Sequence, residues 1–427
     1  MTTATDAHAP IDADSTHTLA GLRCHVCHAT YPATASFVCT ACFGPLEPVY
    51  NEARVAATLT REAIAVRPRN LWRYRELLPI TGEPRTGFTS GWTPLVKADR
   101  LAKRLGVDVI YVKDDGVNHP TLSYKDRVVS VAATRAVELG ATVFACASTG
   151  NLANSVAAHA ARLGLPCFVF IPDNLEPGKV IGSSVYGPHV VAVNGTYDDI
   201  NRLCTQIADR YGWGFANINL RAYYAEGAKT LAFEVVEQLG WTMPAHVVSP
   251  VAGGTLLPRL WRGFKEFEQF GLASGPLPKM YGAQAAGCAP VVNALLEGLD
   301  HPDPVRPNTF AKSIAIGNPA DGFQVLEVLR ASGGWGAKVS DEEIVAAMRL
   351  LAETEGIFTE PAGGTTLAAT KALIDSGRIP RDEPIVVCVT GNGFKTAEAL
   401  SGQTPAPTPM GRGFAEFVKL YESLESK

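Results

Sequence analysis

A lysine beside a loop of hydroxyl and amide side chains is the first candidate for chemistry in this sequence. Lys125 follows the segment Asn118–Tyr124 and begins a run with helical periodicity, Lys125–Leu139. The positive end of a helix dipole disfavours the ammonium form, so we expect a lowered pKa for Lys125. A lysine with a lowered pKa can attack a carbonyl group as a free amine. Lys-Asp-Arg alone, however, is also typical of a surface lysine in a first helical turn.

Three further loops, each after an apolar strand-like run, change that interpretation. Ser148-Thr149-Gly150-Asn151 precedes a helix, and its donors suit an anion or a ring hydroxyl. Gly253-Gly254-Thr255 opens another helix, where backbone N–H groups can closely approach a phosphate. Thr390-Gly-Asn-Gly393 is a loop of the same kind. Each loop alone is weak evidence, but together with Lys125 they predict one cofactor site.

Two C-x-x-C pairs near the N-terminus predict a metal site. Cys24, Cys27, Cys39 and Cys42 lie within residues 23–42. Four thiolates on two tight turns can close a tetrahedral shell around zinc, which leaves no open position for catalysis. We therefore expect a structural zinc. The alternatives are iron in a rubredoxin-like site, or four unrelated buried or disulfide-bonded cysteines. The five scattered cysteines lie in apolar surroundings and are given no catalytic role.

Length and charge limit the class of protein. With 427 residues the chain is too long for a single core, and two or more packed units are expected. The formal charge of -4 offers no attractive field for nucleic acid or anionic lipid. No apolar run approaches the roughly 18 residues that a membrane helix needs. Residues 1–22 contain no Lys or Arg and no long apolar run, so they fit neither a secretory nor a transit peptide and are predicted to be a disordered tail. The protein is expected in the cytoplasm.

The elements that must position these loops alternate between strands and helices. Helix-like segments include Asn151–Leu163, and a capping box, Ser340 to Glu343, opens a helix to about Glu355. This alternation predicts an α/β fold with mainly parallel sheets, which bind ligands at the carboxyl ends of their strands. The predicted strands are Val109–Val112, Thr142–Ala147, Cys167–Ile171, His189–Val193, His246–Ser249, Met280–Ala283 and Ile385–Val389.

The order of these motifs resembles the fold-type II pyridoxal-phosphate (PLP) enzymes. The segments PTLSYKDR, ACASTGN, VAGGT, EGIFTEPAGGTT and CVTGNGFK, together with KSIAIGNPADG, are most similar to threonine synthases. Many threonine synthases also have a short N-terminal metal knuckle. The resemblance extends from about Trp72 to about Glu398. It implies a tryptophan synthase beta-like fold with two domains that contain mainly parallel sheets. A small zinc-ribbon-like knuckle would precede them at the N-terminus.

The resemblance also implies a role for each motif residue. Lys125 would hold PLP as a Schiff base and move protons, and Asn151 would bind the ring hydroxyl. Gly253, Gly254 and Thr255 would bind the cofactor phosphate, and Thr390 would face the pyridine nitrogen. The substrate carboxylate would lie at Ser148, Thr149 and Asn151. Arg221, with Asn217 and Asn219 nearby, is the preferred site for a substrate phosphate, and Arg127 is a weaker candidate that the first helical turn could use structurally.

The implied reaction converts O-phospho-L-homoserine and water to L-threonine and phosphate by γ-elimination and β-replacement. The nearest alternative is another fold-type II lyase, either a cysteate synthase-like β-replacing enzyme or a threonine or serine dehydratase. A catalytically silent paralogue whose knuckle binds a partner is a third interpretation. A Rossmann dehydrogenase is a fourth, but no G-x-G-x-x-G motif opens a helix after a first strand in this sequence. A homodimer is the candidate assembly. The expected divisions are a knuckle at 23–50, a large PLP-binding domain at 51–124 and 231–405, a smaller domain at 125–230, and a C-terminal tail or helix at 406–427.

Overall fold

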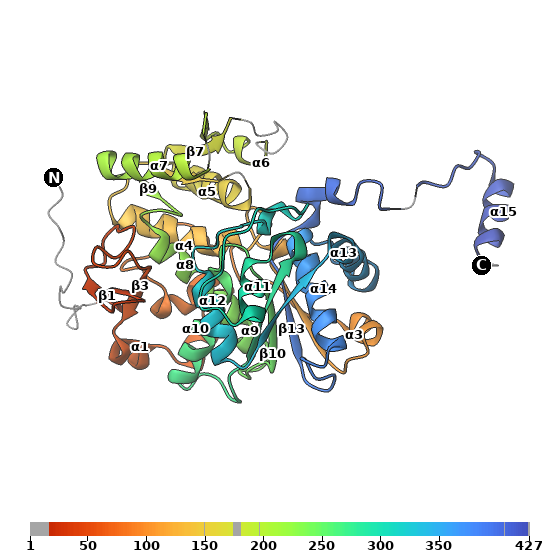
Figure 1. Cartoon of the computed structure of the whole chain (residues 1–427), viewed down its shortest axis with the longest axis horizontal. Coiled ribbons are helices and arrows are strands. Elements are labelled where there is room, and N and C mark those ends of the chain that lie inside the picture. The colour runs from red at the N-terminus through yellow and green to blue at the C-terminus, as the bar shows by residue number, and fades with distance from the viewer. Residues whose placement is uncertain (1–16, 149, 174–180, 196, 405, 426–427) are drawn as a thin grey trace.

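Three sheets organise the part of the chain that the computed structural model describes, which is residues 17–425 except 149, 174–180, 196 and 405. The largest is a central parallel sheet, the second a smaller parallel sheet above it, and the third a small antiparallel sheet at one side (Figure 1). The predicted α/β architecture with mainly parallel sheets is therefore confirmed. In the described residues, no helix is both long and apolar enough to span a bilayer.

The largest sheet has the strand order β12-β11-β10-β13-β5-β4. All neighbouring strands are parallel except the edge pair β4 and β5. Its central strands are buried along their whole length, because helices pack on both faces, and they therefore appear in the sequence as continuous apolar runs. The strands are β4 (Leu95–Lys97), β5 (Ile110–Asp114), β10 (His246–Pro250), β11 (Lys279–Ala285), β12 (Trp335–Val339) and β13 (Ile385–Val389).

The smaller parallel sheet has the order β8-β7-β6-β9. Alternate residues of β6 face opposite layers: Phe144 and Cys146 join the main core, whereas Ala145 and Ala147 pack in a separate apolar cluster. That separate cluster also contains Ile200 of α7 (Tyr197–Tyr211). The strands are β6 (Phe144–Ala147), β7 (Cys167–Pro172), β8 (His189–Val193) and β9 (Gly214–Phe215).

The N-terminal sheet has the order β2-β1-β3 and corrects one predicted boundary. Its strands are β1 (Leu19–Cys24), β2 (Thr30–Tyr31) and β3 (Leu46–Tyr50). Residues 1–16 of the predicted disordered tail lie outside the described residues. The rest of that prediction is wrong from Leu19 onward, because Leu19 and Leu22 are buried and β1 pairs with β3. The unit that holds the paired cysteines thus begins at Leu19 and not at Arg23.

The helices cover both faces of the two parallel sheets. On the largest sheet, α14 packs against β10 to β13, while α10, α11 and α12 contact β10, β11 and β12. The predicted capping box at Ser340 and Glu343 is present at the start of α13. The α-helices not yet given bounds are α1 (Glu52–Thr58), α2 (Arg61–Ala65), α3 (Asp99–Leu105), α4 (Lys125–Glu138), α5 (Asn151–Leu163), α6 (Ile181–Ser184), α8 (Arg221–Glu226), α9 (Lys229–Gln238), α10 (Leu256–Gln269), α11 (Pro290–Glu297), α12 (Gly322–Ala331), α13 (Asp341–Glu355), α14 (Pro361–Asp375) and α15 (Phe414–Glu425).

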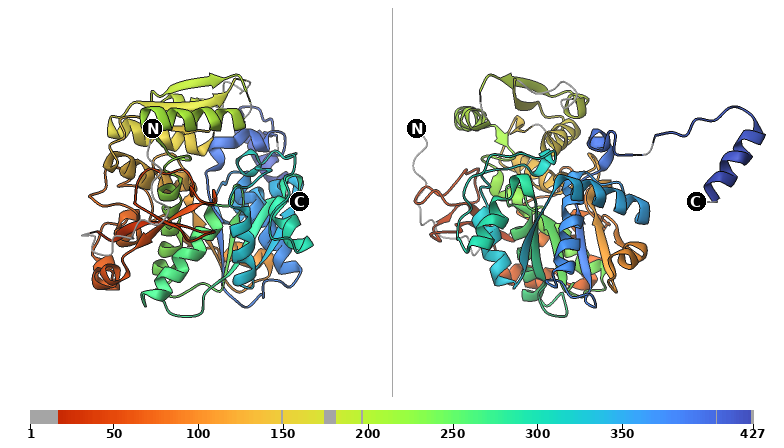
Figure 2. Two further views of the ribbon diagram at one scale, coloured as in Figure 1. Left: turned by 60° about the vertical axis from the view of Figure 1, so that its left-hand side comes forward. Right: turned by 45° about the vertical axis from the view of Figure 1, so that its right-hand side comes forward.

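Short 3-10 helices and the C-terminal segment complete the chain. The 3-10 helices are η1 (Leu71–Leu77), η2 (Asp115–Val117), η4 (Ala286–Cys288), η5 (Lys312–Ile314) and η6 (Gly393–Leu400). Helix α15 lies apart from the body at the end of an extended segment, as Figure 1 and the right-hand view of Figure 2 show. The two parallel sheets draw their strands from the two predicted larger domains, whose exact boundaries stay a prediction.

Candidate active site

The predicted site loops gather where parallel strands end. Ser148 follows β6, the glycine turn follows β10, and Thr390 follows β13. The lysine loop joins the Thr390 loop directly: the Tyr124 N–H donates to the Thr390 carbonyl at 2.9 Å, and Ser123 forms a bridge with Gly391. Chain segments more than 250 residues apart thus form one surface at the carboxyl edge of the sheet, where an α/β fold is expected to bind ligands.

Lys125 is the first residue of α4 and is partly buried. Its Nζ donates to the hydroxyl oxygen of Tyr124 at 2.7 Å and to that of Tyr224 at 2.8 Å. Burial lowers the pKa of Lys125, but the two tyrosines raise it, and the net change is upward. The expectation of a lowered pKa is therefore wrong for this arrangement, because two phenol oxygens stabilise the ammonium. No carboxylate of the described residues forms a direct ion pair with Lys125, although its charge acts on the Glu360 carboxyl.

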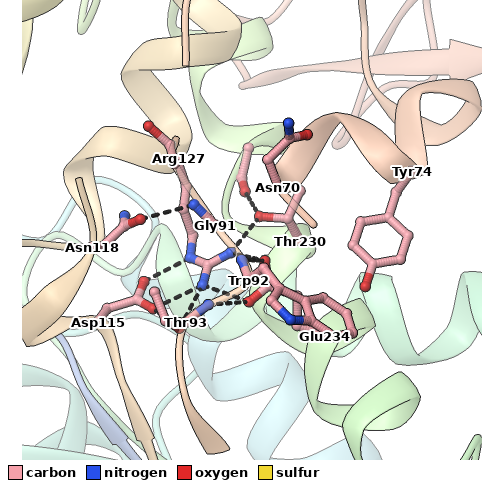
Figure 3. Close-up of polar contacts among 12 residues, drawn as sticks. Asn70, Tyr74, Gly91, Trp92, Thr93, Asp115, Asn118, Arg127, Thr230 and Glu234 are labelled. Carbon is pink, nitrogen blue, oxygen red and sulfur yellow. Dashed lines mark hydrogen bonds and ion pairs between the residues drawn. The ribbon is translucent and has the colours of Figure 1, made fainter. Parts of the chain in front are cut away.

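Arg127, in the first turn of α4, lies in a buried charge network (Figure 3). Its guanidinium pairs with Asp115 at 2.6 Å and with Glu234 at 2.5 Å, and Lys113 contacts Glu234 at 2.7 Å. Burial alone would raise the pKa of Glu234, but Arg127 and Lys113 hold it at about 2. Because all its partners are internal, Arg127 fixes the start of α4 onto η2 and α9. Its weaker candidacy as a substrate-phosphate ligand is therefore wrong.

Asn151 and Thr390 meet at a third residue, Glu360. Asn151 donates to Glu360 Oε2 at 2.9 Å, and the Thr390 hydroxyl lies 3.4 Å from Glu360 Oε1. Burial raises the pKa of the Glu360 carboxyl, although the Asn151 hydrogen bond and the charge of Lys395 act in the opposite direction. Sequence reasoning missed Glu360. Its only signal was the motif EGIFTEPAGGTT, in which a glutamate precedes a proline at a helix start.

The glycine turn has the shape that a phosphate cradle needs. A Cβ added at Gly253 would meet nothing within 4 Å, so the turn is open at that position. Gly254 has φ +93°, and an added Cβ would lie 2.7 Å from the backbone of Asp321. Thr255 occupies the N-cap position of α10 but makes no side-chain capping bond, and the first N–H groups of a helix have no partner within it. An open turn, a close backbone contact and a helix N-terminus together fit the phosphate of PLP.

Only some of the residues predicted to bind the substrate lie near the end of β6. Thr149 lies outside the described residues, and Ser148 is partly buried at the end of β6. Asn217 bonds both backbone groups of Ala147 at 3.3 Å. Asn219 instead closes its own loop, since its side chain accepts from Phe215 N–H and donates to the Trp213 carbonyl. The structure thus brings Asn217, but not Asn219, to the end of β6.

Arg221 begins α8 and contacts a residue that sequence reasoning also missed. Its Nη2 donates to Asp321 Oδ1 at 2.6 Å, and the side chain is 28% exposed. Tyr224, one turn further along α8, reaches Lys125. Helix α8 therefore presents both a guanidinium and a phenol toward the predicted cofactor site.

The four paired cysteines form one cluster at the tip of the N-terminal sheet. The sulfur atoms of Cys24, Cys27, Cys39 and Cys42 all lie within 4.8 Å of one another. Cys24 and Cys42 are 3.4 Å apart and Cys27 and Cys39 are 3.5 Å apart, far longer than a disulfide of about 2.05 Å. A tetrahedron with zinc–sulfur bonds of about 2.3 Å has edges of about 3.8 Å. The donor set and its spacing therefore fit a zinc ion.

Comparison with known proteins agrees with this geometry. Residues 88–391 match the family described as pyridoxal-phosphate dependent enzyme. The threonine synthase of Methanocaldococcus jannaschii is 40% identical over 90% of this chain and 95% of its own length. That of Methanosarcina acetivorans is 36% identical over 91% and 95%.

The fold is shared more widely. Diaminopropionate ammonia lyase from Escherichia coli superposes with a TM-score of 0.61 at 20% identity, over 72% of this chain and 86% of that one. Such low identity supports the fold alone. The family match and the near full-length relatives are more specific: the chain belongs to the pyridoxal-phosphate dependent enzymes and, among them, to the threonine synthase family.

Proposed function

We propose that this enzyme is a threonine synthase that converts O-phospho-L-homoserine and water to L-threonine and phosphate. The observation that carries the proposal is the gathering of Lys125, the Asn151–Glu360–Thr390 group and the glycine turn at loops that follow strands of the two parallel sheets, in a chain similar over 90% of its length to a curated threonine synthase. PLP, when bound, would supply the electron sink that makes protons next to the amino group acidic.

The chain's own groups would bind the cofactor and move protons. Lys125 would hold the cofactor covalently and then shuttle a proton at Cα, with Tyr124 and Tyr224 orienting its Nζ. Asn151 and Thr390 would bind the ring hydroxyl and the pyridine nitrogen. The cofactor phosphate would lie on Gly253, Gly254, Thr255 and the N-terminus of α10.

The substrate would lie between the two sheets' loops. We assign its carboxylate to Ser148 and Thr149, and its phosphate to Arg221 with Asn217 nearby. The guanidinium suits this task because it can form two parallel hydrogen bonds to a phosphate. We also propose one structural zinc on Cys24, Cys27, Cys39 and Cys42. A homodimer and a cytoplasmic location stay predictions from the sequence.

The direct test is an assay of PLP-loaded enzyme with O-phospho-L-homoserine. Phosphate and threonine should appear in equal amounts. The matched control offers L-threonine and L-serine as substrates and measures 2-oxo acids. A dehydratase would produce 2-oxo acids from these substrates and release no phosphate from O-phospho-L-homoserine, and that result would contradict the proposal.

The cofactor lysine can be identified independently of turnover. Borohydride reduction followed by peptide mapping should place the pyridoxyl group on Lys125. Lys113 and Lys229 are buried in ion pairs with Glu234 and Glu226, respectively, so they serve as internal controls that should remain unlabelled. A label on either would overturn the site assignment.

A further inference from the structure

One acidic side chain joins the two predicted phosphate sites. Asp321 Oδ1 accepts from Arg221 Nη2 at 2.6 Å, and Asp321 Oδ2 accepts from the Thr255 hydroxyl at 2.8 Å. Its own N–H donates to the Gly253 carbonyl at 2.9 Å. The side chain is 8% exposed, so these bonds are largely shielded from water. Asp321 therefore links the start of α8 to the glycine turn before α10.

The backbone position of Asp321 makes this arrangement unusual. Asp321 is the N-cap of α12, where an aspartate ordinarily accepts a hydrogen bond from the first turn of its own helix. Here its side chain makes no such bond and turns to Thr255 and Arg221 instead. The backbone packs so closely on Gly254 that no Cβ fits between them. The local capping interaction is thus given up for contacts with two distant elements.

The contact leaves part of the guanidinium available. Within the described residues, Asp321 is the only hydrogen-bond partner of the Arg221 side chain, and it is bonded through Nη2 alone. The remaining N–H groups can face a ligand. An arginine held at one edge loses less conformational entropy when a phosphate binds to its other edge.

We propose that Asp321 is a positioning residue that holds Arg221 in place for the substrate phosphate. This inference rests on the proposed function, in which Arg221 binds that phosphate. Asp321 itself touches no reacting atom. It acts through Arg221, and it sets the affinity for phosphorylated ligands more than the rate of the chemical steps.

The test is a double-mutant cycle on the holoenzyme, with inorganic phosphate as the probe and calorimetry as the readout. A bond to a charged group changes affinity by roughly tenfold or more, so Arg221→Ala and Asp321→Ala should each weaken phosphate binding by about that factor. If Asp321 acts through Arg221, the double variant should bind no more weakly than Arg221→Ala. Asp321→Asn keeps an acceptor for Arg221 and should recover about threefold or more of the affinity lost in Asp321→Ala.

The matched control is Asp300→Ala, which removes the exposed ion pair between Asp300 and Arg330 of α12. This substitution should leave the phosphate affinity unchanged. With O-phospho-L-homoserine, Asp321→Ala should raise KM more than it lowers kcat. Additive losses in the cycle, an unchanged phosphate affinity in Asp321→Ala, or no phosphate binding by the parent enzyme would each overturn the inference. Coupling in the cycle without turnover of O-phospho-L-homoserine would support the inference and contradict the proposed function alone.

Discussion

At the candidate site, the buried carboxyl group of Glu360 lies beside two residues predicted to contact the cofactor. Its relative exposure is 3%, and its pKa is raised by burial. A carboxyl whose pKa is higher in the folded than in the unfolded chain holds its proton more tightly when folded. Stability therefore falls as the pH rises from the ordinary Glu value of 4.5 through the raised value.

Glu360→Gln should remove this part of the pH dependence. Glutamine cannot ionise, yet it keeps an acceptor for Asn151. In cofactor-stripped protein, the thermal midpoint of the parent should fall relative to that of the variant as the pH rises above the ordinary Glu value of 4.5. Two curves that stay parallel over this range would show that the Glu360 carboxyl does not titrate there.

Thr390 is predicted to face the pyridine nitrogen, and its hydroxyl is suited to donate to an unprotonated ring. An aspartate at this position would hold the nitrogen protonated and would also add a second carboxyl beside Glu360. Thr390→Asp should therefore alter the absorption spectrum of bound PLP and the ratio of products, while Thr390→Ser should change both little. An unchanged spectrum in a PLP-loaded aspartate variant would show that Thr390 does not contact the nitrogen.

At the scale of elements, the start of α4 depends on the buried network around Arg127. Arg127→Met leaves Asp115 and Glu234 buried with less compensating charge, and breaking a buried pair in this way costs about 3–5 kcal/mol. The free energy of unfolding, measured by urea titration, should fall by about that amount. Arg100→Met, at an exposed position of α3, is the matched control and should be nearly neutral. Equal effects of the two substitutions would mean that the network contributes little.

The same elements show what sequence patterns can and cannot predict. Strands β10 and β13 are evident because burial on both faces requires continuous apolar runs. Strand β12 was missed, since Gly336 and Lys338 interrupt its apolar character at the edge of the sheet. The loops of Lys125 and Thr390 were found from their local composition.

Long-range partners could not be found in this way. Asn151 and Glu360 are 209 residues apart, and Arg221 and Asp321 are 100 apart. The sequence identifies each side chain as polar but contains no local pattern that pairs it with another. The raised pKa of Lys125 was missed partly for this reason: Tyr124 is its neighbour in the sequence, but Tyr224 approaches it from a helix 99 residues away.

At the scale of the whole molecule, the cysteine-bearing sheet rests on helices that also reach the site. Tyr223 donates to the Thr34 carbonyl at 2.7 Å, and Tyr50 donates to Glu226 at 2.9 Å. Both helix residues belong to α8, which also carries Arg221. Arg135 of α4 reaches the carbonyl of Ala33 in the same way. The N-terminal sheet therefore packs against the two helices that hold Lys125 and Arg221.

Loss of the proposed zinc should act mainly on stability. Cys39 is fully buried, and its replacement would leave three sulfurs and an incomplete shell. The contacts with α8 and α4, however, come from Tyr50, Thr34 and Ala33 and not from the cysteines. Cys39→Ser should thus abolish stoichiometric zinc and lower the thermal midpoint by roughly 5 °C or more, while the folded fraction keeps most of its turnover. Cys204→Ser, in the core of the smaller sheet, is the control that should retain zinc. If folded, PLP-loaded Cys39→Ser were inactive, the metal would act on the site itself and not only on the stability of the sheet that carries it.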